Sequence, residues 1–167
     1  MTDVFKYILL FIGLLFVQIV VLNNVLFGGY INPMLYILFV LIYPLKRDRG
    51  ALLFLAFLLG LIIDFFLDSG GVNAAATVFI AYIRLPLLKG IINKTEIDFL
   101  VFKVTKLPLL KWLSYVVILT FVHHFIVFSL DFFKFNAILT IFSKTFFTSI
   151  FTIILLVFSI VLMNKDK

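Results

Sequence analysis

The fold is decided by residues 51–92, ALLFLAFLLGLIIDFFLDSGGVNAAATVFIAYIRLPLLKGII. Two apolar runs, 51–67 and 72–92, flank the short polar turn DSGG at 68–71. A membrane-spanning helix needs about 20 predominantly apolar residues, so each run is long enough to cross. Because glycine adopts positive φ without steric cost, the turn predicts two antiparallel helices that are direct neighbours in a membrane.

The composition of the whole chain supports a membrane environment. Hydrophobic residues make up 65% and charged residues 13% of its 167 residues. Soluble domains contain roughly 45–50% apolar residues and about 25% charged ones. A soluble domain of this length could not bury so much apolar surface, so we expect lipid around it. The sequence predicts an all-α integral membrane protein that forms one transmembrane domain over residues 1–167.

Four further apolar runs are candidates for spanning helices. They cover residues 7–22, 31–45, 109–130 and 137–163. The run at 31–45 is short for a span, and a five-helix interpretation would omit it. Pro33 suits the first turn of a helix, where its missing N–H has no partner in any case.

The basic residues predict an orientation. Cytoplasmic loops of membrane proteins are enriched in Lys and Arg. If the N-terminus is cytoplasmic, six spans place only Lys134 in an outside loop and Lys144 within the sixth run. The remaining basic residues then lie on the inside: Lys6, Lys46, Arg47, Arg49, Arg84, Lys89, Lys94, Lys103, Lys106, Lys111, Lys165 and Lys167. The sequence therefore predicts a compact six-helix bundle with both ends in the cytoplasm, and this alternation requires the short run at 31–45. Since the excess charge lies in these loops, nucleic acid is not the expected partner.

Four ionisable residues lie inside apolar runs near the predicted outer ends: Asp64, His123, His124 and Lys144. A charge at the centre of a spanning helix costs about 2.5–3.5 kcal/mol, so each needs a reason. One hypothesis pairs Asp64 with Lys144 or a histidine, as a proton relay or ligand site. The alternative is that Asp64 and Lys144 reach the interface by snorkelling. Adjacent histidines face different sides of a helix and cannot together hold a metal ion.

Three other polar positions carry expectations. Arg84 lies deeper, before Pro86, and we expect it to snorkel toward the side of Lys89; a kink at the proline is the alternative. Gln18 and the asparagines at 23–24 end the first run, where interhelical hydrogen bonds and helix capping are both open.

Small residues predict close packing between the two helices of the hairpin, because they let backbones approach in lipid. They are Ala56 and Gly60 on the first helix and Ala74, Thr77 and Ala81 on the second. Asn73 is placed to cap the second helix or to bond across the hairpin. We therefore regard five residues as candidates for structural or partner contacts: Gly60, Asp64, Gly71, Asn73 and Lys144.

No catalytic constellation is found in the sequence. It has no nucleophile elbow, no phosphate-binding loop, no HExxH and no cysteine. We expect a non-enzymatic protein without catalytic residues, metal or cofactor. The segment 93–108 is either an amphipathic helix on the membrane surface or an extension of a neighbouring helix.

The hairpin motif at residues 60–74, GLIIDFFLDSGGVNA, resembles the G-L-x-x-D…G-x-N-A signature of the MreD family of rod-shape-determining membrane proteins. The layout before the motif is also similar to the first third of that family: Gln18, then NN at 23–24, FG at 27–28, NP at 32–33 and YPL at 43–45. The chain length and span number agree with the family as well. The long basic connection before residue 109 and the pair His123–His124 have no counterpart in it.

The resemblance implies a non-enzymatic scaffold subunit of the bacterial cell-wall elongation machinery, in the cytoplasmic membrane. Its partners would be membrane lipid and MreC, with MreB and the RodA–penicillin-binding-protein synthase in the same assembly. Asp64 and Asn73 would then serve helix packing or partner contact. A second candidate is the substrate-binding subunit of an energy-coupling-factor-type vitamin transporter, with Asp64, His124 and Lys144 in an outward pocket. The short outer loops, which leave little material for a lid, count against it.

Overall fold

The protein is a bundle of long apolar helices. The computed structural model describes residues 3–25, 31–45, 48–93, 104, 107–132 and 137–165, which contain no β-strand. Five helices within this part are long and apolar enough to cross a membrane: α1 with its continuation (Val4–Asn24), α3 (Arg49–Leu67), α4 (Val72–Ile92), α5 (Leu109–Phe132) and α6 (Ile138–Lys165, apolar over Ile138–Met163). The expected all-α fold is confirmed for these residues, and five of its helices have the length and apolar character that membrane spans require.

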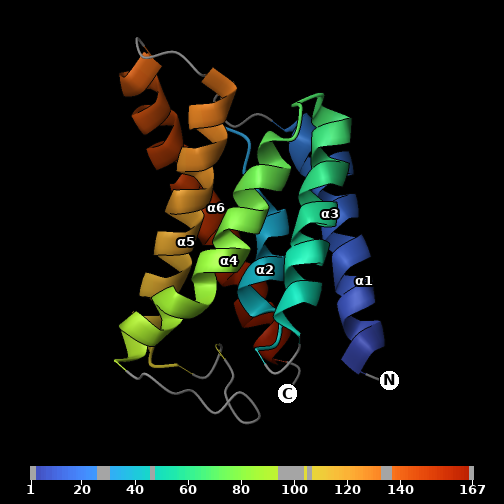
Figure 1. Ribbon diagram of the computed structural model, residues 1–167, viewed down its shortest axis with the longest axis vertical. Helices are drawn as coiled ribbons and strands as arrows, with labels where there is room; N and C mark the ends of the chain where they lie inside the picture. The colour runs from blue at the N-terminus through green and yellow to red at the C-terminus, as the bar shows by residue number, and fades with distance from the viewer. Residues whose placement is uncertain are drawn as a thin grey trace.

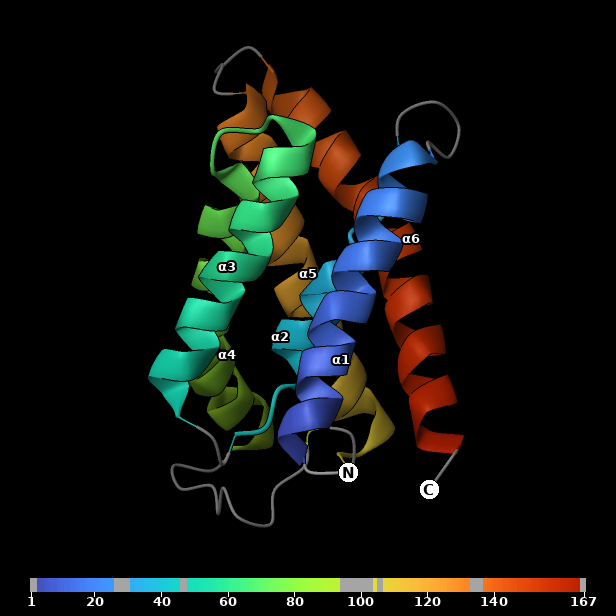
Figure 2. The same cartoon turned by 90° about the vertical axis from the view of Figure 1, so that its right-hand side faces the viewer.

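The helices run up and down between two ends of the bundle (Figures 1 and 2). Both chain termini lie at one end, which we refer to as the terminal end. The turn between α3 and α4 lies at the other, the hairpin end. Helices α1, α3 and α5 run toward the hairpin end, whereas α4 and α6 run back from it.

The first helix changes geometry near its end. Helix α1 (Asp3–Phe16) continues into a π-helical turn, Val17–Val21, and a 3-10 turn, Leu22–Asn24. The Asn24 side-chain amide donates to the carbonyls of Ile19, at 3.1 Å, and Val20, at 2.9 Å. Asn24 therefore caps the helix by satisfying carbonyls that lack intrahelical partners.

The predicted continuous helix over 31–45 is wrong. Helical structure is limited to a 3-10 turn, Leu35–Ile37, and the five-residue helix α2, Leu38–Ile42. Pro44 explains where the helix ends, because the residue before a proline avoids helical angles. Tyr43 accordingly has φ −55° and ψ 135°, which ends the helix. At the other end, Met34 has φ −107° and ψ 78°, so the helical part starts only at Leu35.

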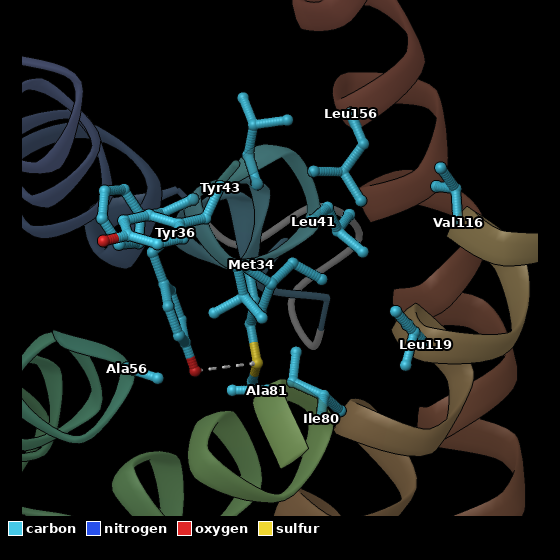
Figure 3. Packing of buried hydrophobic residues seen from close by; sticks show 14 of the residues in the cluster. Met34, Tyr36, Leu41, Tyr43, Ala56, Ile80, Ala81, Val116, Leu119 and Leu156 are labelled. Carbon is cyan, nitrogen blue, oxygen red and sulfur yellow. Dashed lines mark hydrogen bonds between the residues drawn. The ribbon is translucent and has the colours of Figure 1, made fainter. Parts of the chain in front are cut away.

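Residues 31–45, which we refer to as the central segment, form the centre of the bundle. Residues 36–41 are each no more than 1% exposed. Figure 3 shows side chains of the segment among those of four surrounding helices: Ala56 of α3, Ile80 and Ala81 of α4, Val116 and Leu119 of α5, and Leu156 of α6. Helix α1 contributes ring contacts, with Phe11 5.3 Å from Phe39 between centroids. The run that hydropathy supports least is thus the most deeply buried.

The hairpin of α3 and α4 shows the close approach that its small residues predict. Gly70 and Gly71 have φ of +65° and +94° in the turn, a region that glycine enters freely. A Cβ at Gly60 would collide with backbone atoms of α4, including the Ala74 nitrogen at 2.6 Å and the Asn73 oxygen at 2.7 Å. On the other side of α3, phenylalanines such as Phe65 face outward.

Two expectations fall mainly on residues that the structure does not describe. The segment 93–108, expected to be either an interfacial helix or an extension of a neighbouring helix, includes the undescribed stretches 94–103 and 105–106. Lys134 also lies outside the described residues.

Candidate functional site: a buried polar network

Asp64 of α3 caps the beginning of α4. Its carboxylate accepts hydrogen bonds from the backbone N–H groups of Asn73, at 2.9 Å, and Ala74, at 2.8 Å. It also accepts from the Ser69 hydroxyl, at 2.6 Å, and the Asn73 side-chain amide, at 3.0 Å. The first N–H groups of a helix lack intrahelical partners and form its positive end. A buried carboxylate is stable here because each of its oxygens receives such donors.

Asn73 carries the network from the hairpin to the centre of the bundle. Its amide nitrogen donates to Asp64 and, at 3.0 Å, to the Ser69 hydroxyl. Its amide oxygen accepts from the Tyr36 hydroxyl at 2.7 Å. Of the two roles expected for this side chain, the structure shows the bond across the hairpin.

His123 of α5 is the next member. Its Nε2 lies 3.2 Å from the Tyr36 hydroxyl oxygen and 3.4 Å from the Thr77 hydroxyl. Both hydroxyls direct their protons elsewhere, Tyr36 to the Asn73 amide oxygen and Thr77 to the Asn73 backbone oxygen at 2.6 Å. The network therefore assigns the proton to Nε2, which donates to Tyr36. A continuous chain of hydrogen bonds thus joins α3, α4, the central segment and α5.

His124 serves a second, separate set of contacts. Its Nδ1 donates to the Thr120 carbonyl at 2.7 Å, so its Nε2 accepts from the Thr152 hydroxyl at 3.1 Å. Thr152 in turn accepts from the Met34 backbone N–H at 3.1 Å. The two histidines reach different partners, as their adjacency predicts. Within the described residues, no group of three or more His, Cys, Asp or Glu could hold a metal ion.

Gln18 holds the entry to the central segment. Its side-chain oxygen accepts from the Leu35 N–H at 2.8 Å, and its nitrogen donates to the Pro33 carbonyl at 3.1 Å and to Asn23 at 3.0 Å. Gln18 thus makes the interhelical contact that the sequence left open. Together with Thr152, it satisfies N–H groups at the start of a helix that begins inside the bundle.

Arg84 holds the exit of the same segment, and the expectation that it snorkels is wrong. It is 1% exposed, and its two terminal nitrogens donate to the carbonyls of Val40 and Tyr43, each at 2.5 Å. Tyr115 adds a bond to the Leu41 carbonyl at 3.1 Å. The short helix α2 ends inside the bundle, so its last carbonyls need donors, and their partial negative charge stabilises the guanidinium.

The ion pair between Asp64 and Lys144 is also wrong. The Lys144 ammonium lies 4.8 Å from the ring centroid of Phe132 and 5.9 Å from that of Phe128, in cation–π geometry. The described contacts of Asp64 are those of the hairpin. Asp64 reaches a histidine only through Asn73 and Tyr36.

The structure brings four of the five candidate residues together. Gly60, Asp64, Gly71 and Asn73 all lie in the hairpin, where Gly71 precedes the first residue of α4. Lys144 lies apart, between α5 and α6. The sequence interpretation missed Tyr36, although a tyrosine in an apolar run between two prolines is a usable signal.

A row of hydroxyls on α6 was missed as well. Thr145, Thr148, Ser149 and Thr152 follow one helix face at spacings of three and four residues, and all are buried. Such spacing puts residues on the same side of a helix. The row was readable from the sequence as the stretch TFFTSIFT at 145–152.

Over the residues that the structure describes, the protein is a helical bundle with five helices long and apolar enough to cross a membrane, as in a multi-pass membrane protein, and with a polar network buried in its apolar core. A scan against protein-family models finds no match, and no curated protein or solved structure matches the chain significantly. Its functional interpretation therefore rests on its own residues. The hairpin network leaves both carboxylate oxygens of Asp64 engaged by donors, which is suited to holding helices together.

Proposed function

We propose that this chain is a non-enzymatic scaffold subunit of the bacterial cell-wall elongation machinery, which maintains rod shape. The observation that carries the proposal lies in the hairpin motif at residues 60–74. The motif residues that resemble the MreD signature are those that hold α3, α4 and the central segment together. A scaffold that binds its partners through its outer faces is expected to use its motif residues to hold its own helices together.

The engagement of the polar groups supports a structural role over a chemical one. Asp64 accepts from donors at both oxygens, and Asn73 uses both its amide nitrogen and its amide oxygen. A general base needs a free lone pair within reach of a substrate proton. Both side chains are buried and face internal donors, and an amide in the middle of the chain of bonds is a poor proton carrier.

The proposal includes six crossings with both ends in the cytoplasm. The central segment leads from the hairpin end, where α1 finishes, to the terminal end, where α3 starts (Figure 2). The buried short segment thereby acts as the sixth crossing. Lys6, Arg49, Lys89 and Lys111 belong to the terminal-end portions of their helices, so the positive-inside rule makes that end cytoplasmic.

Partners would meet the chain on its apolar faces. Exposed phenylalanines cover the outer side of α3, and α1 exposes most of its length. In the bacterial cytoplasmic membrane these faces contact lipid and, in our proposal, MreC, within an assembly that includes MreB and the RodA–penicillin-binding-protein synthase. The proposed assembly does not include nucleic acid as a partner of this chain.

A transporter subunit that binds a vitamin is the second candidate, and one observation favours it. The hydroxyls of Thr145, Thr148 and Ser149 are buried without partners. Against it, Asp64 and His124 are occupied by internal hydrogen bonds, and Lys144 lies over aromatic rings.

Depletion of the protein in its own bacterium tests the proposal. Loss of the scaffold is expected to turn rods into spheres, and re-expression of the wild type or Asp68→Asn is expected to restore rods. Asp64→Asn is expected not to restore rods, because it loses hydrogen bonds that join α3 to α4. If depleted cells keep their shape and lose uptake of one vitamin, the scaffold proposal is wrong and the transporter candidate replaces it.

A further inference from the structure

The hydroxyl row on α6, which we refer to as the α6 seam, comprises Thr145, Thr148, Ser149 and Thr152. Its four side chains are between 0% and 3% exposed. Thr152 has protein partners, whereas the hydroxyls of Thr145, Thr148 and Ser149 have none. Three neighbouring buried hydroxyls on one face therefore lack any hydrogen bond.

The contacts of Thr152 show what the seam faces. Its hydroxyl lies 3.1 Å from the Met34 nitrogen and 3.1 Å from His124 Nε2, so this face of α6 is directed toward the central segment and α5. The unpaired hydroxyls lie on the same face, one to two turns closer to the hairpin end. The seam is thus an internal surface and does not face lipid.

A fourth unpaired group belongs to Asn32, two residues before Met34 in the chain. The central segment and α6 both run from the hairpin end toward the terminal end (Figure 2), so Asn32 precedes Met34 just as Thr148 precedes Thr152. Two extended residues cover about 6.6 Å, and four helical residues cover about 6 Å. The amide oxygen of Asn32 is also buried without a partner.

Burying a polar group without a hydrogen bond is costly, and native proteins rarely leave several such groups together. The three hydroxyls can each donate and accept, and the Asn32 oxygen accepts. None of these groups is charged, and the neighbouring ammonium of Lys144 lies against the rings of α5. A matching ligand is therefore uncharged and carries both hydrogen-bond donors and acceptors.

We propose that the α6 seam and Asn32 form a buried binding site for a small uncharged hydrogen-bonding molecule. Water is its smallest occupant, and a small polar solute offers the same chemistry. The site involves neither the hairpin nor the outer faces of the bundle, so a dry seam would leave the scaffold proposal standing.

Thermal unfolding of the purified full chain in detergent tests occupancy through the sign of a shift. Thr148→Val and Ser149→Ala each remove one seam hydroxyl with little change of shape. If the site is occupied, each variant loses hydrogen bonds to the bound molecule and Tm falls. If the seam is dry, each variant removes an unpaired hydroxyl, so Tm is unchanged or rises. The second result overturns the proposal.

The same helix offers matched controls. Thr140→Val and Ser143→Ala remove hydroxyls that are exposed, and we expect no shift from either. Thr152→Val removes two observed hydrogen bonds and gives the reference for a known loss. Thr148→Ser keeps a hydroxyl and is expected to retain more of the wild-type Tm than Thr148→Val. Equal shifts from these two variants would assign the loss to packing and contradict the proposal.

A second measurement identifies the occupant. Wild type and Ser149→Ala are denatured after purification, and the released small molecules are compared by mass spectrometry. A polar molecule released by the wild type alone identifies a solute. A lower Tm in the variant with no released molecule identifies water.

Discussion

The α3–α4 hairpin and the α5–α6 pair both bury polar side chains between apolar helices, but they differ in how many of these side chains have hydrogen-bond partners. In the hairpin, Asp64 accepts hydrogen bonds from the Asn73 backbone and side chain, and Asn73 in turn accepts one from Tyr36 in the central segment. Between α5 and α6, Thr152 is satisfied while Thr145 and Thr148 are not. A carboxylate facing a helix N-terminus meets several donors held in place by the backbone. A row of hydroxyls meets such partners only where the facing element supplies them.

The largest expected effect is at Asp64. Asp64→Asn removes the charge and replaces one accepting oxygen with a donor, facing N–H groups that are donors themselves. Since hydrogen bonds to a charged group contribute about 1.5–3 kcal/mol, we expect the free energy of unfolding in detergent to fall by about 3 kcal/mol. Asp68→Asn is the matched control, because Asp68 is exposed and its φ of +52° suits asparagine. Equal losses in the two variants would contradict the stabilising role assigned to the hydrogen bonds of Asp64.

The next effect tests the contact between α3 and α4. Gly60→Ala places a methyl group against the backbone of Ala74 and Asn73, which cannot move aside without separating the helices. Overpacking of this kind costs about 1–3 kcal/mol in the free energy of unfolding. Gly13→Ala is the control, since its Cβ meets nothing within 4 Å. Alanine there is expected to stabilise the helix by up to about 1 kcal/mol. Similar behaviour of both variants would contradict the close approach.

A smaller effect is expected where the hairpin network joins α5. Tyr36→Phe removes the hydroxyl that donates to Asn73 and accepts from His123. The two groups left unpaired are expected to lower the free energy of unfolding by about 1–2 kcal/mol. Unfolding of Tyr36→Phe, of His123→Phe and of the double variant shows whether the two residues are coupled. Strictly additive losses would mean that the network ends at Tyr36.

The smallest effect is expected at Lys144. Lys144→Met removes a partly exposed cation over Phe132 and keeps much of the apolar side chain. An exposed cation–π contact contributes about 0.5–1 kcal/mol, so the loss of stability is small. A loss as large as that of Asp64→Asn would show that Lys144 has a partner beyond the two rings.

Sequence reasoning recovered the helices and the hairpin because both depend on local patterns. The turn at 68–71 predicts an antiparallel pair of helices, and the small residue Gly60 predicts that their backbones approach closely. It could not recover the centre of the bundle in the same way. Hydropathy treats residues 31–45 as a weak span, whereas the helical part starts only at Leu35 and stops before Pro44, so its ends lie inside the protein.

The polar residues show the same limit. From the sequence, a charge at Asp64 or Arg84 is costly in lipid unless it has a partner, and in the structure both side chains are buried and hydrogen-bonded. The partners of Arg84, however, are backbone carbonyls at the end of α2, and those of Asp64 include backbone N–H groups at the start of α4. Almost every residue carries a backbone N–H and C=O group, so residue types in the sequence do not indicate which of these groups will be partners. A search for the opposite charge therefore led to Lys144, which the fold places elsewhere.

A double-mutant cycle tests most directly the claim that Asp64 builds the hairpin. The free energy of unfolding is measured for Asp64→Asn, Asn73→Ala, Lys144→Met and the two double variants that contain Asp64→Asn. We predict a coupling energy of at least about 1 kcal/mol between Asp64 and Asn73, and one within about 0.5 kcal/mol of zero between Asp64 and Lys144. Coupling of Asp64 to Lys144, or recovery of stability when their charges are exchanged, would contradict the account.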